Sequence, residues 1–245
     1  MIEVRALCKR FGSLEVTSDV TLALESGERR GLIGPNGAGK TTLFNLLTGE
    51  LQPDSGSIWL AGKNVTRSSP DARVRAGLGR SFQRNNLFPA LTVEQNLAVA
   101  CALQQGAHRA FWRSFAGLRR VHSAARAMAE RLGLEHELDT RASNLSYGTQ
   151  RQVEIGLALA LEPKVLLLDE PTSGMSPEET AAMQRLITSL PAELTLLIVE
   201  HDMDVLFDIA NTVTVLDFGR VLAQGTPAQI RASETVRIRY LGGHA

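Results

Sequence analysis

Gly34-Pro35-Asn36-Gly37-Ala38-Gly39-Lys40-Thr41-Thr42, here called the phosphate loop, fits the spacing G-x-x-x-x-G-K-[ST]. It follows the apolar run 31–33 and leads into a helix-forming run, 41–48, with Gly49 as its expected end. Glycines let backbone N–H groups close around phosphate oxygens, and the helix N-terminus points its partial positive charge at the same anion. Lys40 would add a full charge at the β and γ phosphates, and Thr41 a hydroxyl ligand for Mg²⁺. The stretch therefore predicts a nucleotide-binding loop between a strand and a helix; the alternative is a glycine-rich turn that binds nothing.

Composition and charge are those of an ordinary soluble globular protein with one or two domains. The chain has 245 residues, 44% of them hydrophobic and 21% charged, and a formal net charge of zero. This balance argues against a strongly basic nucleic-acid-binding protein, so we expect no nucleic acid partner. Cys8 and Cys101 have no metal or redox spacing and are expected to be free thiols. Because no apolar run approaches the ~20 residues that cross a bilayer, any membrane role is expected to depend on a partner.

The chain alternates between two kinds of pattern. Strand-like runs dominate up to residue 82, helical patterns take over from 83 to 150, and strand-like runs return afterwards. We therefore expect one α/β core, about 1–82 and 151–226, split by a helical insert, with a helical tail at 227–245. The expected strands are 2–7, 20–24, 29–33, 57–60, 77–82, 165–168, 195–199, 213–216 and 221–222.

The helical insert has an unusual charge distribution. Between Glu94 and Glu130 there is no acidic residue, whereas five arginines lie among three aromatic residues: Arg109, Arg113, Arg119, Arg120 and Arg126, with Phe111, Trp112 and Phe115. One interpretation is a solvated helical hairpin with a few buried aromatics. The other is a surface that meets a membrane partner or anionic headgroups.

Reactive polar residues follow two of the apolar runs at once. Leu168 leads into Asp169 and Glu170, and Val199 leads into Glu200, His201 and Asp202. Open parallel sheets bind ligands beyond the carboxyl ends of their strands, so these groups are expected to meet at the phosphate loop. Asp169 is suited to hold Mg²⁺, Glu170 to orient or deprotonate a water, and His201 to hydrogen-bond the γ-phosphate. The alternatives are turn chemistry for the two acids and a structural role for the histidine.

The polar turn 145–150 precedes the predicted helix 151–161. Ser146 and Gly148 would offer hydroxyl and N–H donors to a phosphate. Taken alone, this turn is typical of an ordinary helix N-cap.

With these motifs in this order, the chain resembles the ATP-binding cassette (ABC) ATPases over nearly its whole length. The phosphate loop resembles the Walker A motif, 165–170 the Walker B strand with its catalytic Glu170, and 145–150 the signature motif. The resemblance also places Gln83 at the Q-loop, where it acts in catalysis and senses Mg²⁺. It places 172–176 at the D-loop, His201 at the switch histidine, and Phe11 where an aromatic stacks on adenine.

This family implies an α/β P-loop NTPase fold with a RecA-like core, an antiparallel β subdomain and a helical subdomain. It also implies a head-to-tail dimer, in which ATP lies between the phosphate loop of one subunit and the 145–150 turn of the other. Ser146, Tyr147 and Gly148 would then contact the nucleotide of the partner subunit. Tyr147 and Thr149 depart from the usual signature, as Ser176 does from the usual D-loop.

The detailed motifs are similar to those of the ATPase subunits of branched-chain amino acid importers. They are the Ser-Tyr-Gly signature, Glu200-His201-Asp202-Met203 and the ending Tyr240-Leu241-Gly242. This subgroup implies ATP and Mg²⁺ as ligands and a second ATPase subunit and transmembrane permeases as partners. It also implies an indirect link to a solute-binding protein and a location at the cytoplasmic face of the plasma membrane. Alternatives are an ATPase for urea or amide uptake or for lipopolysaccharide transport, a soluble ABC protein without a transport role, and a P-loop kinase.

Overall fold

The computed structural model describes residues 1–81, 87–106 and 119–239. The chain forms two compact units. Unit 1 consists of Met1–Leu78, Lys164–Glu170 and Pro191–Ala245, and unit 2 of Gly79–Pro163 and Pro171–Leu190. The expected division of one domain into a core at 1–82 and 151–226, an insert and a tail stays a prediction.

Unit 1 contains most of a six-stranded sheet whose order is β10-β9-β3-β8-β7-β6. Strand β3 (Arg29–Ile33) pairs in parallel with β8 (Thr195–Val199) and β9 (Thr212–Asp217), and β8 pairs in parallel with β7 (Val165–Asp169). Every residue of β7 and β8 is buried, as their continuous apolar sequences predict. Because these strands are parallel, the residues after Ile33, Asp169 and Val199 emerge at the same edge of the sheet. The outermost strands of the sheet are β10 (Arg220–Gly225), which is antiparallel to β9, and β6 (Leu78–Arg80).

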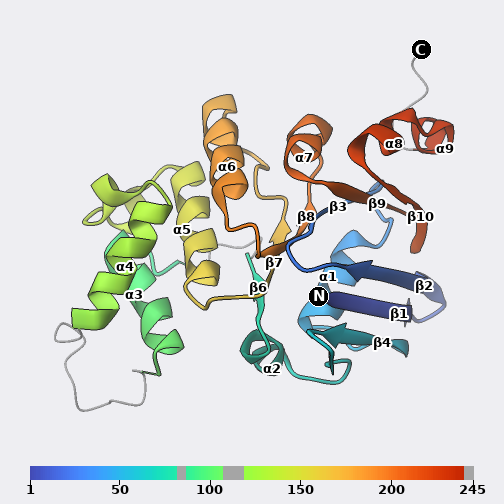
Figure 1. The fold of residues 1–245 in the computed structure, drawn as a ribbon, viewed down its shortest axis with the longest axis horizontal. Helices are drawn as coiled ribbons and strands as arrows, with labels where there is room; N and C mark the ends of the chain where they lie inside the picture. The colour runs from blue at the N-terminus through green and yellow to red at the C-terminus, as the bar shows by residue number, and fades with distance from the viewer. Residues whose placement is uncertain (82–86, 107–118, 240–245) are drawn as a thin grey trace. The chain divides into compact units, whose positions relative to one another are not determined.

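A second, antiparallel sheet has the order β2-β1-β4-β5. Its strands are β1 (Ile2–Phe11), β2 (Leu14–Leu24), β4 (Ser55–Leu60) and β5 (Lys63–Asn64). Helix α1 (Lys40–Thr48) shares one apolar core with both sheets, and Figure 1 shows it beside β1 and β2. Its residues Leu43, Phe44 and Leu46 are fully buried. The helix after the phosphate loop is therefore held on two sides, and it ends at Gly49 as predicted.

The end of α1 is fixed by a buried cation on helix α2 (Pro70–Arg75). Arg73 is 0% exposed and donates from Nη1 to the carbonyl oxygens of Leu46 (2.5 Å) and Leu47 (2.7 Å). Burial lowers the pKa of Arg73 to about 10, so the guanidinium is charged at neutral pH. A cation at a helix C-terminus satisfies the last carbonyl groups and interacts favourably with the helix dipole.

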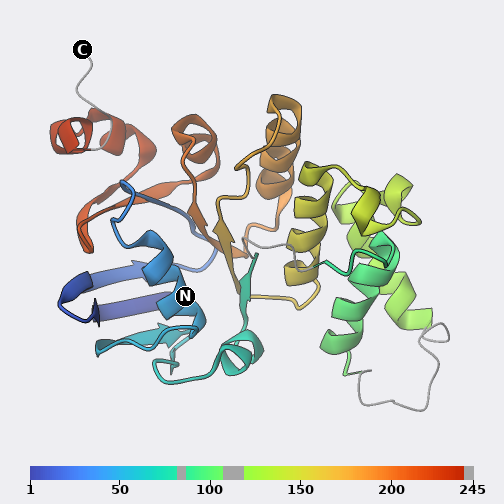
Figure 2. The same cartoon turned by 180° about the vertical axis from the view of Figure 1, so that it is seen from behind.

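Three short helices of unit 1 also lie near the six-stranded sheet: α7 (Met203–Ile209), α8 (Pro227–Ala232) and α9 (Glu234–Arg239). The last two form the tail that the sequence predicts to be helical. Helix α7 packs on β3, where a Cβ at Gly31 would meet the side chain of Leu206 at 2.9 Å. Figure 2 shows α7, α8 and α9 together above the strands of this sheet.

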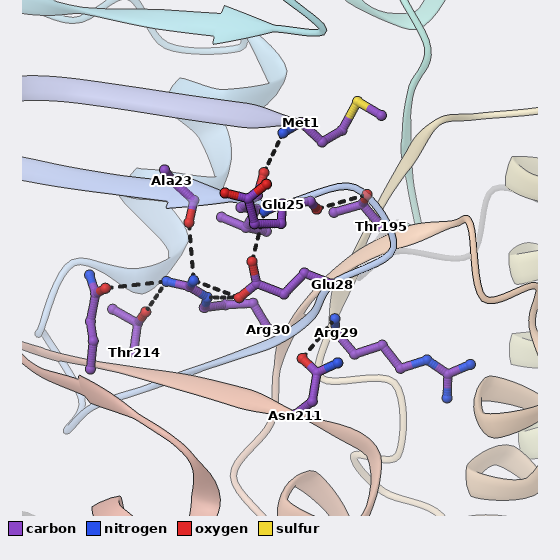
Figure 3. A network of polar contacts seen from close by, with 11 residues as sticks. Met1, Ala23, Glu25, Glu28, Arg29, Arg30, Thr195, Asn211 and Thr214 are labelled. Carbon is purple, nitrogen blue, oxygen red and sulfur yellow. Dashed lines mark hydrogen bonds and ion pairs between the residues drawn. The ribbon is translucent and has the colours of Figure 1, made fainter.

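A buried polar network joins the two sheets of unit 1 (Figure 3). Arg30 on β3 donates to Glu28 (2.6 Å), to the carbonyl oxygen of Ala23 on β2 (3.0 Å) and to Thr214 on β9 (3.1 Å). Its charge is therefore paired although the side chain is buried. The network ties the antiparallel sheet to the strand that leads into the phosphate loop.

Unit 2 is mainly helical. It contains α3 (Val93–Gln104), α4 (Arg119–Arg131), α5 (Tyr147–Leu159) and α6 (Pro177–Ser189), with short 3₁₀ turns at Glu135–Glu137 and Ala142–Asn144. Figure 2 shows α3, α4 and α5 lying side by side. Helix α5 begins four residues earlier than predicted, because Ser146 is its N-cap. None of the helices described for this chain is long and apolar enough to cross a membrane.

One acid joins α3 to α4 in unit 2. The carboxylate of Glu94 accepts from Arg126 Nε (3.0 Å), and His122 Nδ1 lies 3.0 Å from it. Arg126, and secondarily His122, lower the pKa of Glu94. The acid-free arginine-rich segment is thus partly neutralised by an acid from the preceding helix; its aromatic residues, at 111, 112 and 115, lie outside the described residues.

Candidate functional site

The phosphate loop lies where the sequence predicts it, between β3 and α1. Gly34 has φ +155°, and a Cβ there would lie 2.2 Å from the carbonyl oxygen of Leu216 on β9. Gly39 has φ +100°, and a Cβ there would lie 2.6 Å from the carbonyl oxygen of Val16 on β2. Each of these two glycines thus lets the loop touch the backbone of a neighbouring strand, which a side chain would prevent.

Lys40 is folded into the loop that precedes it. Its ammonium group donates to the carbonyl oxygens of Gly34 (2.6 Å) and Pro35 (3.0 Å). Burial lowers the pKa of Lys40, while the charges of Glu170 and Asp169 act in the opposite direction. One cation is therefore held close to two carboxylates at the edge of the sheet.

A pocket of roughly 190 Å³ opens at this edge. It is lined by Val16, residues 36–42, Glu170 and His201. Phe11 is not part of its lining; it lies at the end of β1, half exposed, with the ammonium group of Lys9 5.7 Å from its ring centre. The structure thus brings together seven loop residues, the glutamate and the histidine that the sequence predicts as neighbours.

Glu170 and His201 form a direct pair. His201 Nε2 lies 2.7 Å from Glu170 Oε1. Glu170 has φ +49°, a left-handed conformation that few residues of its kind adopt, and its N–H donates to the carbonyl oxygen of Val199 (2.8 Å). Strained backbone of this kind is concentrated at functional sites, where the surrounding structure enforces it.

Asp169 is the last residue of β7 and is only 2% exposed. Its negative charge, after that of Glu170, acts to raise the pKa of Lys40 against the effect of burial. Thr41 lines the pocket one residue after Lys40. The donor set on this edge thus offers one hydroxyl and one buried carboxylate, which are the oxygen ligands that Mg²⁺ prefers.

One residue of the pocket was not anticipated, and one residue beside it was. Val16 lines it because β2 begins at Leu14, six residues before the predicted strand. Glu200 is buried, and its Oε1 accepts from the N–H of His201 (2.8 Å), which fixes the turn that carries the histidine. The sequence gives no signal for Val16, whereas Glu200 is expected at this edge because it stands directly after an apolar run.

The 145–150 turn belongs to unit 2. Ser146 accepts from the N–H of Thr149 (3.2 Å) as the N-cap of α5, and the Tyr147 hydroxyl accepts from Arg151 Nε (3.2 Å). The Ser146 hydroxyl and the Gly148 N–H both donate to Glu179, a residue of α6 to which the sequence analysis gave no role in the site. Gln83, the remaining predicted site residue, lies outside the described residues.

Comparisons with known proteins identify the family of this chain. The family described as "ABC transporter" matches residues 17–173. The chain is 39% identical, over 99% of its length and 98% of the relative, to the high-affinity branched-chain amino acid transport ATP-binding protein LivG of Escherichia coli (strain K12). It is 33% identical, over 96% of its length and 95% of the relative, to the lipopolysaccharide export system ATP-binding protein LptB of Haemophilus influenzae.

A solved structure has the same fold. It is the ADP conformation of MJ1267, an ATP-binding cassette of an ABC transporter, with a TM-score of 0.85 and 27% identity. The alignment covers 99% of this chain and 98% of the other. The predicted α/β P-loop fold is therefore confirmed, and the chain belongs to the ATP-binding subunits of the ABC transporter family.

Proposed function

We propose that this chain hydrolyses ATP to power an importer for branched-chain or other hydrophobic amino acids. The observation that carries the proposal is the single pocket lined by the phosphate loop, Glu170 and His201. The substrate class rests on the 39% identity to LivG.

Phosphate binding is assigned to the phosphate loop. The backbone N–H groups of residues 36–39 and the start of α1 would surround the phosphates. Lys40 would exchange its two carbonyl acceptors for phosphate oxygens, which carry a full negative charge. We assign Phe11 to adenine by the family resemblance, since the half-exposed ring leaves a face for stacking.

The residues present fit a magnesium ion. Mg²⁺ is bound in such sites by one or two carboxylates together with substrate phosphates, rather than by an all-protein cage. In the part of the chain that the structure describes, no group of three or more acidic, histidine or cysteine side chains is placed to hold a metal ion. Thr41 and Asp169 would hold Mg²⁺ beside the phosphates, and Gln83 is a further candidate by resemblance. When bound, the ion would neutralise negative charge on the β and γ phosphates.

Hydrolysis is assigned to Glu170. Its carboxylate lines the pocket and can orient a water and accept its proton during attack on the γ-phosphate. His201, 2.7 Å away, would hold that carboxylate and hydrogen-bond the γ-phosphate. A carboxylate positioned for water favours hydrolysis over phosphoryl transfer to another acceptor.

Two copies of an ATPase subunit would form each complete site. Ser146, Tyr147 and Gly148 of one subunit would contact the nucleotide held by the phosphate loop of the other. ATP would then favour the paired state because the γ-phosphate has donors from both chains. Transmembrane permeases would hold the pair peripherally at the cytoplasmic face of the plasma membrane, and a solute-binding protein would deliver the substrate to those permeases.

The catalytic assignment is tested by Glu170→Gln. We expect kcat to fall at least ~100-fold because the amide cannot accept the water proton, while ATP affinity stays the same. Phosphate release from ATP alone and equilibrium nucleotide binding measure the two quantities, with Glu178→Gln as the control for charge. A Glu170→Gln variant that turns over normally would remove Glu170 from this role, and an absolute requirement for a phosphoryl acceptor would favour a kinase.

The transport assignment is tested by assembly with the permeases encoded by neighbouring reading frames. Stimulation of the ATPase by a leucine-loaded binding protein would support amino acid import. Lipopolysaccharide export is the second candidate, because of the 33% identity to LptB. Assembly with export permeases and no response to leucine would favour it.

A further inference from the structure

The side chain of Glu179 joins the start of α5 to the start of α6 within unit 2. Its Oε1 accepts from the Ser146 hydroxyl (2.8 Å) and from the Gly148 N–H (3.0 Å). Its Oε2 accepts from the N–H of Ser176, the N-cap of α6 (3.0 Å). One carboxylate thus holds donors from two segments, and two of these donors are the ones assigned above to phosphate.

We propose that Glu179 is a positioning residue that holds the 145–150 turn in the unpaired subunit, and that the γ-phosphate of the partner's ATP must displace it. The inference rests on the proposed function, because it needs the turn to face a nucleotide. Glu179 itself touches neither nucleotide nor metal in this proposal; it acts through Ser146 and Gly148.

Glu179 and a phosphate must compete for the Ser146 hydroxyl and the Gly148 N–H, because each donor has only one proton. A serine hydroxyl and a backbone amide each have one proton to donate. While the Ser146 hydroxyl donates to Glu179, it cannot donate to a phosphate oxygen, and the same holds for the Gly148 N–H. The side chain of Ser146 is also fixed from the other side, since it accepts from the N–H of Thr149.

Charge and space make joint occupancy unfavourable. Hydrogen bonds from Ser176, Ser146 and Gly148 lower the pKa of Glu179 to about 2, so the carboxylate is ionised at neutral pH. A Cβ at position 148 would lie 2.8 Å from the Glu179 carboxyl carbon, which shows how closely the acid contacts this backbone. An incoming phosphate would meet a like charge at the same donors.

Helix capping alone does not account for both contacts. The capping box of α6 needs one side-chain oxygen at position 179, for the N–H of Ser176, and glutamine fills that role as well as glutamate. Only a carboxylate has a second acceptor oxygen to direct at α5. Glu179→Gln can therefore keep the cap and release the 145–150 turn, because the amide NH₂ group cannot accept from Ser146 or Gly148.

The experiment measures ATP-dependent pairing of the full chain in the Glu170→Gln background. Sedimentation with Mg²⁺ and ATP gives the dimer dissociation constant for the background alone, with Glu179→Gln and with Glu178→Gln. We expect Glu179→Gln to lower this constant at least about tenfold, since charge-assisted bonds no longer compete with phosphate. Glu178 precedes Glu179 on the same helical turn, but the hydrogen bonds to Ser146 and Gly148 are made by Glu179, so the Glu178→Gln constant should stay within about twofold of the background.

A second measurement separates positioning from structure. In the chain with Glu170 intact, Glu179→Gln should lower the ATP concentration for half-maximal hydrolysis without lowering kcat. Weaker or unchanged pairing, or a higher KM, would make Glu179 a structural brace and overturn the proposal. Glu179→Asp, which retracts the carboxylate, should also strengthen pairing, so a poorly folded glutamine variant still leaves a result.

The proposed function fails in a distinguishable way. If the Glu170→Gln background does not pair in ATP at all, the head-to-tail arrangement is wrong, and the role of Glu179 is overturned with it. If the background pairs and Glu179→Gln does not strengthen pairing, only the role of Glu179 is lost.

Discussion

The polar groups of the phosphate loop and of the 145–150 turn are both hydrogen-bonded within the subunit, but the charged group has the opposite sign in the two places. In the phosphate loop a cation is held by neutral acceptors: Lys40 donates to two carbonyl oxygens. In the 145–150 turn an anion holds neutral donors: Glu179 accepts from Ser146 and Gly148. The cation of the phosphate loop attracts a phosphate. In the 145–150 turn the Glu179 carboxylate already occupies the donors that a phosphate would need.

This difference suggests an order of events. An incoming triphosphate improves the environment of Lys40, because full negative charges replace carbonyl dipoles. The same triphosphate must remove a carboxylate from the 145–150 turn. Nucleotide should therefore bind first to the phosphate loop of a single subunit, and pairing should follow as a separate, more costly step.

The largest effect is expected for Lys40→Ala. Charge-assisted hydrogen bonds contribute roughly 1.5–3 kcal/mol, so the dissociation constant for ATP should rise by about 10- to 150-fold. Titration of the unpaired subunit with ATP measures it, with Lys63→Ala on the exposed β5 as the control. Equal ATP affinity in the Lys40→Ala chain would contradict the statement that the cation in the phosphate loop attracts the phosphates.

An intermediate effect is expected from pH, which tests the anion in the 145–150 turn. The pKa of Glu179 is about 2 in the folded chain, whereas the ordinary value for a glutamate is 4.5. A lowered folded pKa adds stability that is present above about pH 4.5 and is lost as the pH falls toward 2. The difference in melting temperature between the native chain and Glu179→Gln should therefore shrink as the pH is lowered through this range. A difference that does not depend on pH would mean that the charge does not hold the turn.

The smallest effect is expected at the turn that supports the phosphate loop. Phe218 and Gly219 connect β9 to β10 with φ +43° and +74°, and the Gly219 N–H donates to the carbonyl oxygen of Ala38 (3.0 Å). Phe218 is 82% exposed, so little packing offsets its left-handed backbone, and asparagine is favoured at this position of such a turn. Phe218→Asn should raise the free energy of unfolding by about 1 kcal/mol, measured by urea denaturation. Phe88→Asn, at a half-exposed position without positive φ, should give no gain.

The pocket could be predicted from sequence because its parts follow local rules. The phosphate loop has a fixed spacing, and Glu170 and His201 each stand two residues after an apolar run that becomes one of two neighbouring parallel strands. Strand direction alone then brings them to one edge of the sheet. The left-handed backbone conformation of Glu170 depends on contacts across the sheet, so no pattern in the neighbouring sequence predicts it.

Contacts between distant segments could not be predicted in this way. Glu179 lies 33 residues after Ser146, and its own neighbourhood indicates only a helix start. Arg73 occurs in a short polar segment, although it is fully buried in the fold. In both residues a charged side chain finds partners through tertiary structure, which a linear pattern does not encode.

The position of Arg73 has a consequence for ionic strength. Salt weakens only those electrostatic interactions that its ions can approach, and the guanidinium at the end of α1 is out of their reach. The opposite end of the same helix faces an open pocket. In concentrated salt the interaction of Arg73 with the C-terminal end of α1 is therefore little screened. Counterions act on the N-terminal end of the helix, where the nucleotide would bind.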